Sequence, residues 1–180
     1  MSKIPQATTV EEHRFADDGH VPNNPLLPLL VYRGVLDTTG AGAASSCMAL
    51  FARHGWTGAW RNGIYAHHHY HSTAHEVLGI VAGSAHVRLG GEQGRTLVLA
   101  AGDVAVIPAG VAHKCETASP DLLVVGAYPR GQSPDIRQAG ARERERALSR
   151  IAAVPLPEAD PVHGGDGPLI ERWRPAAAAR

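Results

Sequence analysis

The sequence lacks several features that are typical of particular classes of protein. Its 180 residues include only two cysteines, Cys47 and Cys115, which are too few for a disulfide scaffold or a thiolate zinc site and indicate a reducing, cytoplasmic location. Lys plus Arg number 17 and Asp plus Glu number 17, so the formal net charge is zero, which disfavours a nucleic-acid partner. No run approaches the roughly 18 uncharged apolar residues of a membrane helix, and the first ten residues are not typical of a signal peptide. We therefore expect a soluble protein that binds neither nucleic acid nor membrane.

Glycine and proline, in contrast, are plentiful. The 20 Gly and 13 Pro predict many tight turns and few long helices. Asn62-Gly63 is typical of a two-residue hairpin turn between a strand ending near Arg61 and one beginning at Ile64. Further short strands are predicted at 29–36, 76–81, 85–89, 96–99, 104–107, 112–117 and 122–127. Strands of this length at near-regular spacing indicate one β sandwich or barrel, over residues 29–128.

The barrel is flanked by segments of other character. Residues 1–28 carry several prolines and are expected to form an irregular arm, because proline removes a donor and restricts the residue before it. Apolar residues at helical spacing predict a helix near 42–54, with Gly55 as its C-terminal cap. In 129–180, we expect a short helix at 141–152 and a Pro- and Gly-rich tail that packs on the barrel through Trp173.

Histidine is the unusual count, at 11, with five between residues 67 and 75. Because residues two apart on a strand project to the same side, His69 and His71 share a face. A turn after His71 brings Glu76 back on the neighbouring strand, and a turn shaped by Pro108 and Gly110 aims His113 from a different strand. Three nitrogen donors and one carboxylate make a site for one divalent transition metal ion: Fe, Mn, Ni, Cu or Zn. The predicted ligands are His69, His71, Glu76 and His113.

The residues around these ligands are candidates for a substrate pocket. Tyr65 and His67 lie on the ligand face, where either could act as an acid or base, and Cys115 follows His113 by two residues and faces the same interior. Cys115 is also consistent with a small buried apolar residue. His68 and His75 fit solvent-facing or outer hydrogen-bonding roles better than ligation.

Two segments resemble the motifs of the cupin superfamily. The first consists of Gly63, His69, His71, Glu76 and Gly83, and the second of Gly102, Pro108, Gly110 and His113; Thr117 stands where many cupins have Asn. Looser similarity over 21–34 and 160–169 is closest to the uncharacterised YjlB-like single-domain cupins.

The resemblance implies a fold and leaves the reaction open. The implied fold is all-β, a double-stranded β-helix (jelly-roll) barrel with one metal ion inside and one or two peripheral helices, often in a homodimer. Cupins include dioxygenases, isomerases and non-enzymatic binding proteins, so the fold does not select a function. We expect either a metal-dependent enzyme, dioxygenase-like or isomerase-like, that acts on a small organic substrate, or a metal cupin that binds a small ligand as a sensor or carrier.

Overall fold

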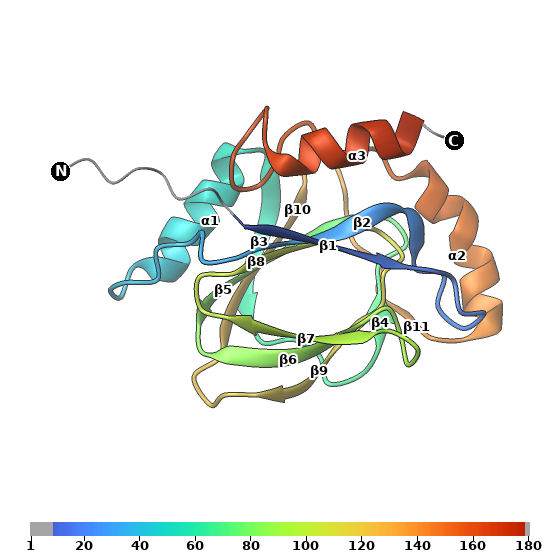
Figure 1. Ribbon diagram of the computed structural model, residues 1–180, viewed down its shortest axis with the longest axis horizontal. Coiled ribbons are helices and arrows are strands. Elements are labelled where there is room, and N and C mark those ends of the chain that lie inside the picture. The colour runs from blue at the N-terminus through green and yellow to red at the C-terminus, as the bar shows by residue number, and fades with distance from the viewer. Residues whose placement is uncertain (1–8, 179–180) are drawn as a thin grey trace.

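The computed structural model describes residues 9–178 and consists of two antiparallel sheets that face each other, with three helices around them (Figure 1). The strands are β1 Val10–Phe15, β2 Asn24–Tyr32, β3 Trp56–Asn62, β4 His69–Tyr70, β5 Glu76–Ala82, β6 Ser84–Leu89, β7 Arg95–Ala100, β8 Val104–Ile107, β9 His113–Ala118, β10 Leu123–Pro129 and β11 Arg137–Gln138. The helices are α1 Ala43–Arg53, α2 Ala141–Ala153 and α3 Pro168–Ala178. The prediction of an all-β jelly-roll barrel is confirmed.

The two sheets enclose one apolar core. The larger sheet has the strand order β1-β2-β8-β5-β10-β3, and the smaller has the order β11-β4-β9-β6-β7. Strand β5 lies inside the larger sheet and is buried on both faces, because Leu78 and Ile80 pack between the sheets while Val77 and Val81 pack outward. This double burial explains why the strand is a nearly continuous apolar run instead of an alternating pattern.

Helices α1 and α3 lie on the outer face of the larger sheet, as Figure 1 shows. Phe51 and Cys47 of α1 approach β5 at Gly79, where an added Cβ would stand 2.7 Å from the Cys47 sulfur. Glycine at this position therefore allows the helix to approach the sheet closely. The predicted helix near 42–54 is confirmed, and Gly55 has the left-handed backbone (φ +79°) expected of a C-terminal cap.

The expectation of an irregular arm over residues 1–28 is wrong in its described part, because β1 and the first five residues of β2 lie within it. The prolines do not prevent pairing, since the register between the two strands shifts between His13 and Phe15, and Pro25 and Pro28 fall in the irregular part opposite this shift. Proline is tolerated at such a bulge because no ladder hydrogen bond is lost there. Residues 1–8 lie outside the described residues.

The predicted hairpin at Asn62-Gly63 is also wrong. Strand β3 ends at Asn62 but pairs with β10, and residues 63–68 form no strand. The short-range turn signal was outweighed by a pairing between segments far apart in the chain, which no local pattern reports. Instead, Gly63, Ile64 and Tyr65 of this segment line the cavity described below.

The tail contains a third helix, which was not predicted because the segment is rich in Pro and Gly. Pro168 occupies the start of α3, where its missing N–H costs nothing, and the buried Asp160 carboxylate accepts the backbone N–H of Leu169. Trp173 is fully buried on the outer face of the larger sheet, as predicted, and its indole N–H donates to the Pro28 carbonyl. Within residues 9–178, none of the helices is both long enough and apolar enough to cross a membrane.

Replacing Trp173 with Ala is expected to lower the free energy of unfolding by about 3–5 kcal/mol, because a fully buried indole is lost and a cavity remains. Urea unfolding followed by circular dichroism measures the change as a lower midpoint at unchanged slope. The matched variant Trp173→Phe should retain most of the stability. A loss below about 1 kcal/mol for the alanine variant would contradict the packing role of α3.

Candidate metal centre

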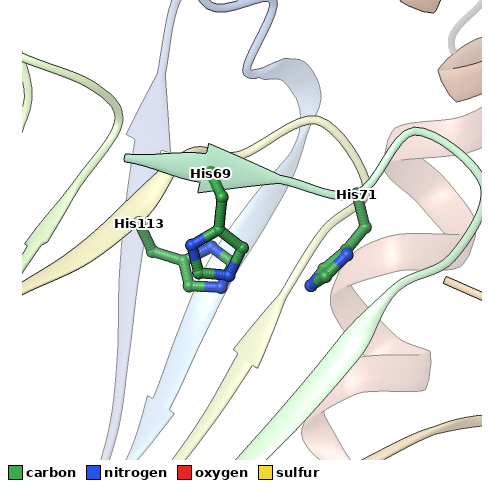
Figure 2. A group of neighbouring side chains, drawn as sticks. All are labelled: His69, His71 and His113. Carbon is green, nitrogen blue, oxygen red and sulfur yellow. The ribbon is translucent and has the colours of Figure 1, made fainter. Parts of the chain in front are cut away.

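Two histidines face each other where β4 pairs with β9. His69 on β4 is the direct cross-strand partner of His113, the first residue of β9. Their ring centroids are 4.1 Å apart, and both side chains are buried. Figure 2 shows the two rings on the same side of their strands. Strand pairing alone therefore brings together two nitrogen donors that are distant in the sequence.

His71 completes the group from the end of β4. Its ring turns toward the other two (Figure 2), with centroids 5.4 Å from His69 and 5.7 Å from His113. It is also buried. One ring nitrogen from each of the three histidines lies within 4.8 Å of the other two, so the group could hold a metal ion.

Each of the three rings directs its Nδ1 atom at a backbone carbonyl oxygen. The distances are 3.4 Å from His69 to His67, 3.1 Å from His113 to Val111 and 2.5 Å from His71 to Asp135. Because a carbonyl oxygen only accepts hydrogen bonds, Nδ1 is the protonated nitrogen in each ring. When such a ring is neutral, its Nε2 atom keeps the lone pair, which is the arrangement of histidines that bind metal ions.

Glu76 brings a carboxylate into the same group. It is the first residue of β5, is 3% exposed, and places Oε2 3.2 Å from Nε2 of both His71 and His113. The structure thus brings together all four predicted ligands, although the group of mutually close atoms contains only the three histidines. Glu76 approaches this group from the larger sheet, whereas His69 and His113 belong to the smaller one.

Burial and charge act in opposite directions on these groups. Burial alone raises the pKa of Glu76, but the imidazoles of His71 and His113 outweigh it and hold the pKa below its usual range. Burial, together with the neighbouring His113 and His71, lowers the pKa of His69 to about 3. Burial lowers the pKa of His71, but Glu76 and Asp135 outweigh it and leave the pKa raised. The carboxylate is therefore ionised, and the group requires a positive charge at its centre, carried by a proton or a metal ion.

A cavity of about 360 Å³ opens onto the four residues. Its wall combines the three histidines and Glu76 with aromatic and aliphatic side chains, which is the usual composition of a small-molecule site. The lining residues are Trp60, Arg61, Asn62, Gly63, Ile64, Tyr65, His69, His71, Glu76, Leu78, His113, Tyr128, Pro134 and Ile136. Tyr65 stands at the opening, where it is 52% exposed.

The other residues singled out in the sequence lie outside the group of four predicted ligands. His67 is exposed, stacks on the ring of Tyr65 at 5.1 Å and is not part of the cavity wall. Cys115 packs against the apolar cluster between the sheets, and burial raises the pKa of its thiol. His68 lies 3.0 Å from Glu92. His75 accepts the backbone N–H of Ala109 beneath Trp173.

Sequence reasoning missed three residues that border the centre. Tyr128 lies on the same face of β10 as Val124, which packs between the sheets, so the alternation in this strand could have placed it inside. Trp60 lies on β3 and is part of the cavity wall. Asp135 lies in the loop before β11, and no local pattern in the sequence points to it.

Asp135 holds His71 from outside the cavity. Its backbone carbonyl accepts from the His71 ring, while its carboxylate accepts the backbone N–H and the hydroxyl of Ser72 and the guanidinium of Arg137. Burial alone raises the pKa of Asp135, but these hydrogen bonds lower it to about 2. The neighbours Pro134 and Ile136 line the cavity, so one loop both orients a histidine and forms part of the wall.

The Asp135 hydrogen bonds predict a dependence of stability on pH. A carboxyl whose pKa is lower in the folded than in the unfolded protein stabilises the fold above about pH 4, and the gain is lost as the pH falls from 4 toward 2. Asp135→Asn should therefore reduce the slope of stability against pH in this range, by an effect on the order of 1 kcal/mol. Urea midpoints between pH 5 and 2.5 measure it, with the exposed Asp121→Asn as control. Equal slopes for Asp135→Asn and wild type would show that these bonds do not stabilise the fold.

One family model and one curated relative match this chain. The model of the "Cupin domain" family matches residues 60–125. The uncharacterized protein YjlB of Bacillus subtilis (strain 168) is 42% identical over 159 residues, which cover 88% of this chain and 93% of YjlB.

Solved structures are more distant. Acireductone dioxygenase from Bacillus anthracis, solved with a cadmium ion in its active centre, is 14% identical with a TM-score of 0.38, over 70% of this chain and 82% of the enzyme. The dTDP-4-dehydrorhamnose 3,5-epimerase of the same organism is also 14% identical, with a TM-score of 0.36 over 71% and 74%. Procruciferin from Brassica napus, 14% identical with a TM-score of 0.37, matches over 76% of this chain and 29% of procruciferin.

Proposed function

This chain belongs to the cupin family, among the YjlB-like members, and on that premise we propose that it binds one divalent transition metal ion and uses it to act on a small organic molecule. The proposed ligands are Nε2 of His69, His71 and His113 and the carboxylate of Glu76. The cavity above them would hold the substrate. The cytoplasmic location and the homodimer stay predictions.

The observation that carries this proposal is the orientation of the three imidazoles. With each Nδ1 bonded to a carbonyl oxygen, three neutral Nε2 atoms and a buried, ionised carboxylate converge on one point. Lone pairs gathered in this way repel one another unless a cation lies between them. A single shared proton could bridge only two of the four groups, whereas a metal ion can accept all four.

The donor set indicates the kind of ion. Imidazole nitrogens with one carboxylate suit Fe, Mn, Ni, Cu or Zn better than Ca or Mg, which prefer sites made only of oxygen. Such an ion, when bound, supplies a Lewis acid and a position where substrate or dioxygen can bind. The chain itself contributes the orientation of the ligands and an apolar wall that excludes water.

A non-enzymatic role as a sensor or carrier is the second candidate. Apart from the four proposed ligands, the ionisable side chains that line the cavity are Arg61 and two tyrosines, Tyr65 and Tyr128. None of these is an imidazole or a carboxylate, the usual general bases in proteins, so any proton transfer would depend on the ligands themselves or on a bound water. This observation favours binding without turnover.

Substituting His71 with Ala should lower the metal content of the purified protein by at least about tenfold, because one of four ligands is lost. The metal content is measured by elemental analysis of untagged protein from its native host. His86→Ala, which removes an exposed imidazole on β6, is the matched control and should leave the metal content unchanged. Full occupancy with unchanged spectra in His71→Ala would contradict the site.

Removal of the metal separates the two candidate functions. If the protein is an enzyme, a panel of small organic acids, ketones and phenols should contain a compound that is turned over by the metal-loaded protein and not by the chelated protein. Oxygen uptake and product analysis measure this. Oxygen consumption linked to a substrate supports a dioxygenase, and product without oxygen consumption supports an isomerase. Metal-dependent binding without product for any bound compound would support the sensor or carrier instead.

A further inference from the structure

The hydroxyl of Tyr128 borders the proposed metal ligands inside the cavity. Its oxygen accepts a hydrogen bond from the indole N–H of Trp60 at 2.8 Å, and its ring centroid lies 6.1 Å from that of His71. Because the oxygen acts as acceptor toward Trp60, the O–H proton is donated elsewhere, and it faces the Glu76 carboxylate. Burial and this carboxylate together raise the pKa of Tyr128. Tyr128 is therefore a hydrogen-bond donor held in place next to the metal centre.

The indole ring of Trp60 forms a flat part of the cavity wall, and its position is fixed by the strand pairing. It stands opposite Gly126 in the pairing of β3 with β10, and an added Cβ at Gly126 would come within 2.1 Å of the indole. Glycine at this position allows the ring to lie across β10. With Ile64, Leu78 and Ile136, the indole makes one side of the cavity apolar.

The cavity wall offers no free cationic side chain. Among residues 9–178, Arg61 is the only Lys or Arg that lines it. Its guanidinium donates to the hydroxyl of Ser45 on α1 at 2.8 Å, on the outer side of the sheet. Trp60, its neighbour on the strand, points inward, so Arg61 points away, as alternation requires. A ligand with several negative charges would thus meet only the charge of the metal centre, where Glu76 already offsets part of that of the ion.

We propose that the cavity takes a small molecule with a flat apolar body and at most one negative charge, whose oxygen at the metal replaces the Glu76 carboxylate as the acceptor of the Tyr128 hydrogen bond. In this arrangement Tyr128 orients the oxygen group, and Trp60 and the aliphatic residues bind the body. The proposal rests on the proposed metal site and adds to it the class of ligand and the residue that selects its orientation.

The test uses Co²⁺-loaded full-length protein and two metal-binding probes that differ only in their body, acetohydroxamate and benzohydroxamate. Calorimetric titration gives both affinities after the Co²⁺ content of each sample has been measured. Benzohydroxamate should bind roughly tenfold more tightly than acetohydroxamate, because its ring is buried against Trp60. Tyr128→Phe should weaken both probes by about tenfold at unchanged Co²⁺ content, because the donated hydrogen bond is lost.

Two further variants keep the result interpretable. Trp60→Ala should remove the preference for benzohydroxamate. Tyr70→Phe is the matched control, because this hydroxyl is buried beneath α2, has no hydrogen-bond partner among the described residues and lies outside the cavity; it should change neither affinity.

The contrary outcomes are distinct from one another. Equal affinity of Tyr128→Phe and wild type for both probes would overturn the role of the hydroxyl. Equal affinity of wild type for the two probes, or tighter binding of inorganic pyrophosphate than of either, would overturn the proposed class of ligand. Failure of the wild-type protein to take up Co²⁺ would refute the metal site, and the present proposal with it.

Discussion

Glu76 carries a negative charge into the interior of the barrel, where its side chain is 3% exposed. A carboxylate that is removed from water and left without partners costs several kcal/mol. Here Oε2 stands 3.2 Å from a nitrogen of His71 and of His113, and the pKa of the carboxyl is lowered in spite of its burial. Because β5 lies between β8 and β10 inside the larger sheet, the carboxylate is held by a rigid strand. The rest of the site is arranged around this charge.

The two sheets have different roles in supporting the centre. The larger sheet is buried on both faces, by the apolar core on one side and by α1 and α3 on the other. It supplies Glu76, Tyr128 and Trp60 to the cavity wall. The smaller sheet supplies His69 and His113 through the pairing of β4 with β9. Nitrogen donors and the carboxylate therefore come from opposite layers and meet only when the barrel is closed.

Groups outside the cavity decide how the donors are oriented. Three backbone carbonyls accept hydrogen bonds from the Nδ1–H groups of the rings. The carbonyl that accepts from His71 belongs to Asp135, whose carboxylate accepts hydrogen bonds from Ser72 and Arg137. Pro134 and Ile136 on either side of Asp135 form part of the wall. The same loop therefore orients one of the three imidazoles and forms part of the cavity wall.

Much of this protein could be predicted from local sequence. The two motifs named His69, His71, Glu76 and His113, and the structure brings these four side chains close together. They could be named because alternation along a strand and the glycine and proline turns are short-range properties. The short strands from 76 to 127 and the helices α1 and α2 follow from the same patterns. What local patterns could not report is pairing between distant segments: β3 joins β10 instead of a neighbouring hairpin partner, and β1 joins β2 across a proline-containing bulge.

The sequence by itself determined the fold class and the four candidate ligands, because residue type and spacing decide which side chains can converge from adjacent strands. Only the tertiary structure decided which nitrogen of each imidazole faces the centre, that His67 and Cys115 stand outside the cavity wall, and that Tyr128, Trp60 and Asp135 border the site. These features depend on contacts between segments far apart in the chain, and the free energy of such contacts is set by the packing of the whole barrel.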